Sequence, residues 1–270
     1  MQNWLESHKQ SGFYGIWGSG FIKVPKDGAL LSNCWPSYDK EGSCKGVLKL
    51  APVRVRQHVN PLSEKYQTPV SPIDWEKLYA APSQPLHLDI GCGKGRFLLS
   101  MATLQANWNF LGLEIREPLV QEANTWRSEL GLTNLHYLFC NVNNSLRSLL
   151  SPIPPGTLQR VTIQFPDPWF KNRHAKRRLV QPELVAELAS YLAAGGVIFI
   201  QSDIKPLAVE MCDRFDAHPA FQRQGTEDWL AENPLPVPTE REKSTLSRGE
   251  PVYRALFVRV DAGATHTRVF

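Results

Sequence analysis

The sequence predicts an α/β protein built on an open, mostly parallel sheet with helices on both faces. Three observations predict this class. From residue 86 onward, apolar runs with strand character alternate with runs of helical periodicity. A glycine turn at residues 91–95 joins the first of these strands to the first helix. Polar residues stand at or just after the expected strand ends, the edge where such sheets bind ligands. They are Asp89, Glu114, Asn141, Asp167 and Asp203.

The elements follow in order along the chain. The expected strands span residues 86–90, 109–114, 135–140, 159–165, 196–202 and 252–260. The expected helices span residues 95–105, 116–130, 182–194 and 205–217, with a short turn near 144–150. Together they form one main domain over residues 86–262. Residues 51–85 precede it as an N-terminal arm, in which five prolines between positions 61 and 85 argue against a long helix.

The first 50 residues differ from the rest in composition. They hold seven of the eighteen glycines and show no period of 2 or 3.6 residues. This predicts a loosely ordered N-terminal extension, or sequence read from a mis-assigned start. No function is assigned to it.

Composition excludes several classes of protein. The five cysteines are odd in number and scattered, with no C-x-x-C pair, so neither a disulfide framework nor a zinc site is expected. This usage fits a reducing cytosol, and we expect a cytoplasmic protein without a metal. No apolar run approaches the length that spans a membrane, so no membrane association is expected. With a net charge of +4 the chain is only mildly basic, so a nucleic-acid partner can be inferred only from where the positive charge lies in the sequence.

The glycine turn has the pattern G-x-G-x-G. A dinucleotide fingerprint would need glycine at Arg96, and a phosphate-binding P-loop would need Ser or Thr at Gly95. An acid before the turn, Asp89, suits the ammonium group of a methionine moiety. Glu114 ends the second strand, where an acid can accept both ribose hydroxyls of an adenosine. Together these residues favour S-adenosylmethionine lying against the turn at Gly91 and Gly93, rather than a tight turn without a ligand.

Two further residues at strand ends are candidates for this site. Asn141 offers both a donor and an acceptor, as an adenine edge requires, although an ordinary turn asparagine is the alternative. Asp167 lies between Pro166 and Pro168, which stiffen its backbone. A carboxylate on a stiff backbone suits the task of holding a planar base. The alternative is a rigid exit from the strand, in which Asp167 accepts a hydrogen bond from a backbone N–H group. Trp169 either stacks on a base or packs in the core.

A basic run follows the Asp167 segment. Five of the eight residues from Lys171 to Arg178 are lysine or arginine, in a chain whose net charge is only +4. Charge concentrated beside a site predicts a polyanionic substrate, bound through its phosphates. The phosphate candidates in the run are Arg173, Lys176, Arg177 and Arg178. Arg54 and Arg56 alternate in the arm and are either further phosphate contacts or a solvated strand edge.

The carboxyl-terminal part adds residues that suit a guanine. Asp203 ends the fifth strand, and the stretch Thr239-Glu240-Arg241-Glu242 follows later. Carboxylates folded back over the sheet can accept hydrogen bonds from N1–H and the N2 amino group of guanine. The alternative is a charged loop and nothing more.

These motifs, in order and spacing, resemble the bacterial tRNA (guanine-N7-)-methyltransferase family of class I methyltransferases. The matching segments are L-D-I-G-C-G-K-G, L-G-L-E-I, F-P-D-P-W-F-K-N-R-H-A-K-R-R, S-D, T-E-R-E-K and G-E-P-V-Y-R, within residues 53–260. Asn141 stands where many members have aspartate, and Arg241 where an aromatic or apolar residue is common.

The resemblance implies a Rossmann-like fold, S-adenosylmethionine as cofactor, and methylation of N7 of guanine 46 in the variable loop of tRNA. It implies that Asp89, Glu114, Asn141 and Asp167 bind the cofactor, with Asp167 also catalytic. It further implies substrate contacts at Lys171, at Asp203 and from Thr239 to Glu242. The expected partner is tRNA, and nothing indicates an obligate protein partner.

Two other functions compete with this one. A methyltransferase acting on a small molecule or a protein does not explain the basic run. A non-catalytic RNA-binding protein on the same scaffold does not explain the presence of Asp89, Glu114 and Asp167. Fold alone does not separate these alternatives.

Overall fold

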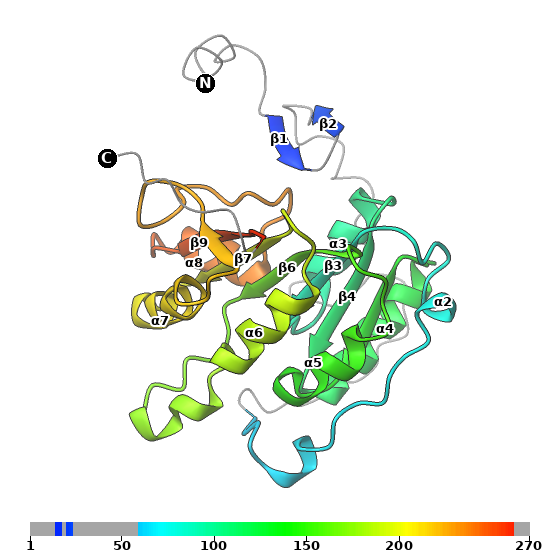
Figure 1. Cartoon of the computed structure of the whole chain (residues 1–270), viewed down its shortest axis with the longest axis horizontal. Coiled ribbons are helices and arrows are strands. Elements are labelled where there is room, and N and C mark those ends of the chain that lie inside the picture. The colour runs from blue at the N-terminus through cyan, green and yellow to red at the C-terminus, as the bar shows by residue number, and fades with distance from the viewer. Residues whose placement is uncertain (1–13, 18–19, 24–58, 262–270) are drawn as a thin grey trace. The chain divides into compact units, whose positions relative to one another are not determined.

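The computed structural model describes residues 14–17, 20–23 and 59–261 (Figure 1). The chain divides into two units, Met1–Arg54 and Val55–Phe270. In the first unit, β1 (Tyr14–Trp17) pairs antiparallel with β2 (Gly20–Lys23). The sequence analysis assigned no element here, because two four-residue strands are too short to show a period. Arg54 and Arg56 lie outside the described residues, so their phosphate role stays a prediction.

The second unit contains a seven-stranded sheet with the order β5-β4-β3-β6-β7-β9-β8. Its strands are β3 (Leu86–Ile90), β4 (Asn109–Glu114), β5 (Leu135–Phe139), β6 (Leu158–Gln164), β7 (Val197–Ser202), β8 (Phe221–Arg223) and β9 (Tyr253–Arg259). The neighbours among β3 to β7 pair in parallel, and β9 runs antiparallel to both β7 and β8. The predicted open, mostly parallel sheet is confirmed, and each predicted strand is correct to within one residue. Within this seven-stranded sheet, the three-residue β8 was missed.

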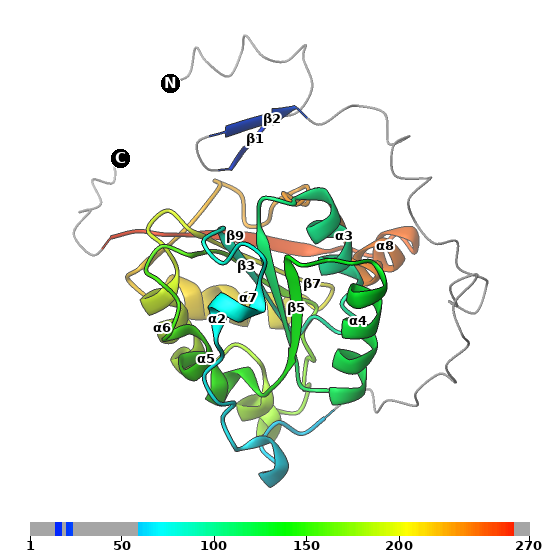
Figure 2. The ribbon, with the colours of Figure 1, turned by 90° about the vertical axis from the view of Figure 1, so that its right-hand side faces the viewer.

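Helices cover both faces of this sheet. They are α3 (Arg96–Leu104), α4 (Glu117–Glu129), α5 (Val142–Leu150), α6 (Pro182–Tyr191) and α7 (Lys205–Asp216). Figure 2 shows α3 and α4 on one side of the sheet and α5, α6 and α7 on the other. The interior strand β3 is buried along its whole length, as expected for a parallel sheet covered on both faces. The arm contributes only the short helix α2 (Trp75–Leu78) and a single 3₁₀ turn (Glu64–Tyr66) to the described structure.

Two segments are more ordered than the sequence analysis expected. The predicted short turn near 144–150 is the nine-residue helix α5, and Asn141 caps it by accepting the Asn143 N–H at 3.2 Å. The segment read as a possible charged loop begins α8 (Glu240–Ser247), where the Thr239 hydroxyl accepts the Glu242 N–H at 3.1 Å. The pattern Thr-x-x-Glu is a capping-box signature that could have predicted this helix.

Candidate active site

The glycine turn connects β3 to α3 in a backbone form that ordinary side chains rarely adopt. Gly91, Gly93 and Gly95 have φ angles of 81°, 57° and 74°. At Gly95 a Cβ atom would also lie 2.7 Å from the Tyr137 ring, and the Tyr137 hydroxyl donates to the Gly95 carbonyl at 2.6 Å. At Gly91 and Gly93 an added Cβ atom would meet only ordinary contacts, with Leu179 at 3.9 Å and Arg116 at 3.8 Å, so there the backbone conformation alone requires glycine. The turn is therefore fixed by packing at its end and left uncovered at its beginning.

A cavity lies at the carboxyl ends of β3, β4, β5 and β6. Its lining includes five of the predicted site residues, Gly91, Glu114, Asn141, Asp167 and Arg177, but neither Asp89 nor Gly93. Pro61 from the arm adds to its wall. Segments up to 120 residues apart in sequence, from Val59 to Leu179, thus meet at the edge where the sequence predicts a ligand, because parallel strands end on the same side of a sheet.

Asp89 is a buried carboxylate on β3, 3% exposed. Its Oδ1 atom accepts from the Thr162 hydroxyl at 2.5 Å and from the Gln164 amide at 3.4 Å. Burial raises the pKa of Asp89 to about 6, although these two hydrogen bonds lower it. The partners described for this carboxylate are all uncharged, so the site can accept a cation.

Glu114 is also buried, at 3% exposure, but it already has several donors. Its Oε2 atom accepts the Gly93 N–H at 2.9 Å and Arg116 Nη2 at 3.0 Å. Its Oε1 atom accepts the N–H and Nε of Arg116 at 3.0 and 2.9 Å. Burial opposes the charge on Arg116, but the contacts with Glu114, and then the charge of Asp167, raise its pKa. A ribose at Glu114 would have to share this carboxylate with Arg116 or displace it.

Asn141 joins the arm to the sheet edge. Its Nδ2 atom donates to the carbonyls of Pro61 and Tyr66 at 3.1 and 3.3 Å, while its Oδ1 caps α5. An aspartate could cap the helix but could not donate to the two carbonyls. The amide at this position therefore holds the arm against the cavity, and the turn role that the sequence analysis kept as an alternative is present in the structure.

Asp167 lies in a loop whose backbone is strained on both sides. Phe165 has a φ of 51° and Trp169 a φ of 42°, although neither is glycine. Such conformations cost of the order of 1–3 kcal/mol each and persist only where the surroundings hold them. The Phe165 N–H donates to the Gln201 carbonyl at 2.8 Å. The Trp169 ring packs edge-on against His174 at 5.6 Å and under the Arg177 guanidinium at 5.0 Å.

The basic run forms a 3₁₀ helix over Asn172–Arg177. Lys171, Arg173 and Lys176 are exposed, as phosphate contacts require. Arg177 is half-buried over Trp169, and the side chain of Arg178 is directed toward the protein. The run therefore presents part of its charge to solvent and uses the rest for internal contacts.

The predicted guanine residues lie in two different environments. Arg241 donates to Asp203 Oδ2 through Nε at 2.9 Å and Nη2 at 2.5 Å, and Glu240 pairs with Arg96 at 2.5 Å. The latter contact joins the first turn of α8 to the first turn of α3. Thr239, Glu240 and Arg241 are partly or fully exposed, whereas Glu242 is 1% exposed.

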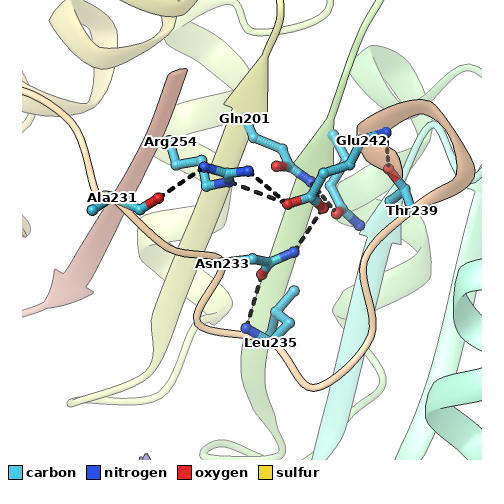
Figure 3. A network of polar contacts seen from close by, with 8 residues as sticks. Gln201, Ala231, Asn233, Leu235, Thr239, Glu242 and Arg254 are labelled. Carbon is cyan, nitrogen blue, oxygen red and sulfur yellow. Dashed lines mark hydrogen bonds and ion pairs between the residues drawn. The ribbon is translucent and has the colours of Figure 1, made fainter. Parts of the chain in front are cut away.

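Glu242 lies at the centre of a buried network (Figure 3). Its Oε1 atom accepts from Arg254 Nη2 at 2.8 Å, and its Oε2 atom accepts from Asn233 at 2.7 Å and Gln201 at 3.1 Å. Arg254 also donates to the Ala231 carbonyl at 3.3 Å. The network ties α8 to β7, to β9 and to the loop before α8. This anchoring role of Glu242 was missed. The Thr-x-x-Glu pattern, which indicates the start of a helix, is the one local signal related to it.

A chain of hydrogen bonds connects this network to Asp89. Gln201 donates to Gln164 Oε1 at 2.8 Å, and Gln164 donates to Asp89. Among the described residues, no group of three or more His, Cys, Asp or Glu side chains could hold a metal ion. Within the same part of the chain, no helix is both long and apolar enough to cross a membrane.

The fold and this site define a Rossmann-like methyltransferase. A family model described as "Putative methyltransferase" matches residues 83–255, which include the sheet from β3 into β9. A tRNA (guanine-N(7)-)-methyltransferase of Nostoc sp. (strain PCC 7120) is 71% identical over 214 residues, covering 79% of this chain and 98% of the relative. The enzyme of that name from Synechococcus elongatus is 61% identical, covering 79% and 100%, and that from Synechocystis sp. is 55% identical, covering 78% and 99%. The chain belongs to the tRNA (guanine-N7-)-methyltransferase family.

Proposed function

We propose that this cytoplasmic enzyme transfers the methyl group of S-adenosylmethionine to N7 of guanine 46 in the variable loop of tRNA, forming 7-methylguanosine. The observation that carries the proposal is the cavity that gathers Gly91, Glu114, Asn141 and Asp167 beside the buried Asp89, in a chain of this family. The exposed positive charge on the 3₁₀ helix beside the cavity supports a polyanionic substrate.

The donor set fits S-adenosylmethionine. Asp89 would receive the ammonium group, because it is a buried carboxylate whose described partners are uncharged. The turn at Gly91 and Gly93 would lie against the methionine part, since Gly91 lines the cavity and neither glycine carries a side chain. Glu114 would receive the ribose hydroxyls beside Arg116, and Asn141 the adenine edge. When bound, this cofactor supplies an electrophilic methyl group on a sulfonium.

Methylation at N7 needs positioning more than proton transfer. The N7 lone pair lies in the plane of the ring and forms the new C–N bond, while the C–S bond breaks with its electron pair left on sulfur. Positive charge thereby passes to the guanine ring. The carboxylate of Asp167 in the cavity would stabilise this charge more in the transition state than in the ground state.

The substrate would approach from the side of β6, β7 and α8. Lys171, Asp203 and the turn from Thr239 to Arg241 would contact the guanine, and the buried network of Glu242 would support that turn. Arg173, Lys176 and Arg177 would contact tRNA phosphates, which supply affinity rather than sequence reading. The base would have to leave its tertiary pairing to reach the cavity.

The test is to incubate the protein with unmodified tRNA transcript and methyl-labelled S-adenosylmethionine, then to identify the labelled nucleoside. We expect label in 7-methylguanosine and its loss when guanine 46 is replaced. An Asp167→Ala variant should lose most of the turnover while keeping its affinity for tRNA. Label in another nucleoside, or no label although the cofactor binds, would overturn the proposal.

A further inference from the structure

Arg178 is the one member of the basic run whose described contacts use every guanidinium nitrogen. Nε donates to the Pro168 carbonyl at 3.1 Å, and Nη2 donates to the Trp169 carbonyl at 3.3 Å. Nη1 forms an ion pair with Glu210 on α7. The side chain of Arg178 is 18% exposed, whereas Lys176 two residues earlier is exposed. The guanidinium of Arg178 would therefore have to give up contacts within the protein in order to bind a phosphate.

Glu210 is held in turn from the other side. Its Oε1 atom accepts from Arg214 Nη2 at 2.9 Å, one helical turn further along α7. The carboxylate therefore connects a stable helix to the guanidinium of Arg178. Because α7 packs against β7, this contact fixes Arg178 relative to the sheet.

The two carbonyls that Arg178 holds belong to the residues directly after Asp167. One of them is the carbonyl of Trp169, whose φ of 42° is strained. The other end of the loop is held by the hydrogen bond between Phe165 and Gln201. A strained loop needs such contacts to keep a single shape, and Asp167 lies between them.

We propose that Arg178 and Glu210 form a positioning pair that holds the loop of residues 165–169 in the shape that presents Asp167, and that Arg178 does not bind tRNA phosphate. This inference rests on the proposed methyl transfer for its readout. It gives Arg178 a different role from that of its neighbours in the basic run, a distinction that the sequence alone does not make.

Steady-state kinetics on tRNA, repeated over a range of salt concentrations, test the pair. Arg178→Lys keeps the charge but loses the planar fork, so kcat should fall about 10- to 100-fold. The KM for tRNA and its salt dependence should stay near the wild-type values. Lys176→Gln should do the opposite: it should raise KM and reduce the slope of log affinity against log salt by about one.

Glu210→Gln decides between positioning and phosphate binding. If Arg178 positions the loop, loss of the Glu210 charge should lower kcat to a similar extent as Arg178→Lys. If Arg178 binds phosphate, removing a competing carboxylate should leave kcat unchanged and KM unchanged or lower. A Glu210→Gln variant with wild-type kcat, or an Arg178→Lys variant whose defect lies in KM and salt slope, would overturn the inference.

Matched controls exclude a general loss of fold. Arg147 and Glu187 form another Arg–Glu pair, at 3.2 Å, between α5 and α6. Arg147→Lys and Glu187→Gln should keep wild-type kcat. Thermal unfolding and cofactor affinity are measured for every variant, and a fall in kcat fully explained by the fraction unfolded or unbound would also overturn the inference. A wild-type protein that does not methylate tRNA would instead overturn the proposed function itself.

Discussion

Asp89 and Glu242 are both buried carboxylates at the same sheet edge, and one chain of hydrogen bonds through Gln164 and Gln201 connects them. Their partners differ. Asp89 accepts hydrogen bonds from a hydroxyl and an amide, and burial raises its pKa to about 6. Glu242 forms a buried ion pair with Arg254 and accepts from two further amides.

The difference separates a carboxylate that we propose to bind a ligand from one that the protein uses for its own structure. A buried charge is costly unless it is paired, so a carboxylate whose described hydrogen-bond donors are neutral, as at Asp89, is suited to a cationic ligand. Glu242 already has its cation within the protein. Burial is therefore common to both residues, although Asp89 lies on β3 and Glu242 on α8, and the charge of the nearest partner distinguishes them.

The largest expected effect is on stability, from Glu242→Gln. The substitution leaves the guanidinium of Arg254 buried without its counter-charge, which should lower the free energy of unfolding by about 3–5 kcal/mol. Urea denaturation measures it. The exposed pair of Arg248 and Glu250, 2.6 Å apart, is the control, and Glu250→Gln should leave stability nearly unchanged. Equal losses in the two variants would contradict the structural role of Glu242.

Asp89→Asn should give the reverse result. The amide is easier to bury than the carboxylate, so stability should be unchanged or higher. Cofactor affinity, measured by calorimetry, should fall at least about thirtyfold, since one partner of a buried charge pair is lost. An Asp89→Asn protein that binds S-adenosylmethionine normally would remove the basis of the comparison.

Cofactor affinity should depend on pH through Asp89 and change by about one order of magnitude. Because the pKa of Asp89 is about 6, affinity should be full above pH 7 and about tenfold lower at pH 5. The folded state keeps a proton between pH 4 and pH 6 that the unfolded chain releases. The contribution of Asp89 to the free energy of unfolding therefore decreases as pH rises through this range. Both effects should be absent from Asp89→Asn and present in Glu250→Gln.

The sequence indicates where Asp89 lies in the sheet, but it does not indicate that Glu242 is buried in an ion pair with Arg254. Asp89, Glu114 and Asn141 are found from local signals, because each ends an apolar strand and parallel strands end together. Glu242 takes its role from Arg254 on β9 and Asn233 in a loop, and pairings between distant elements leave no periodic signal. Arg178 is similar, since its partner Glu210 lies 32 residues further along the chain. Arg178 and Lys176 look equivalent in a basic run until the tertiary structure separates them.

Strands and helices also differ in how well local sequence signals predict them. Strands β3 to β7 and β9 were predicted to within one residue, because buried strands between glycine and proline signals are distinctive. Helix α5 was read as a turn, since its asparagines and serines have low helix propensity and its buried face of Leu146, Leu149 and Leu150 carries the structure.

The smallest expected effect comes from the two hydrogen bonds that reach Asp89. Thr162 donates at 2.5 Å and Gln164 at 3.4 Å, so removing the first should raise the pKa of Asp89 more than removing the second. In Thr162→Val, the midpoint of cofactor binding should therefore move to higher pH, and in Gln164→Met it should move less. Among the described hydrogen bonds, those of Gln164 also provide the only link between Gln201 and Asp89. If Gln164→Met weakened cofactor binding more than Thr162→Val did, Asp89 would depend on the network around Glu242, and the two carboxylates would have to be treated as one unit.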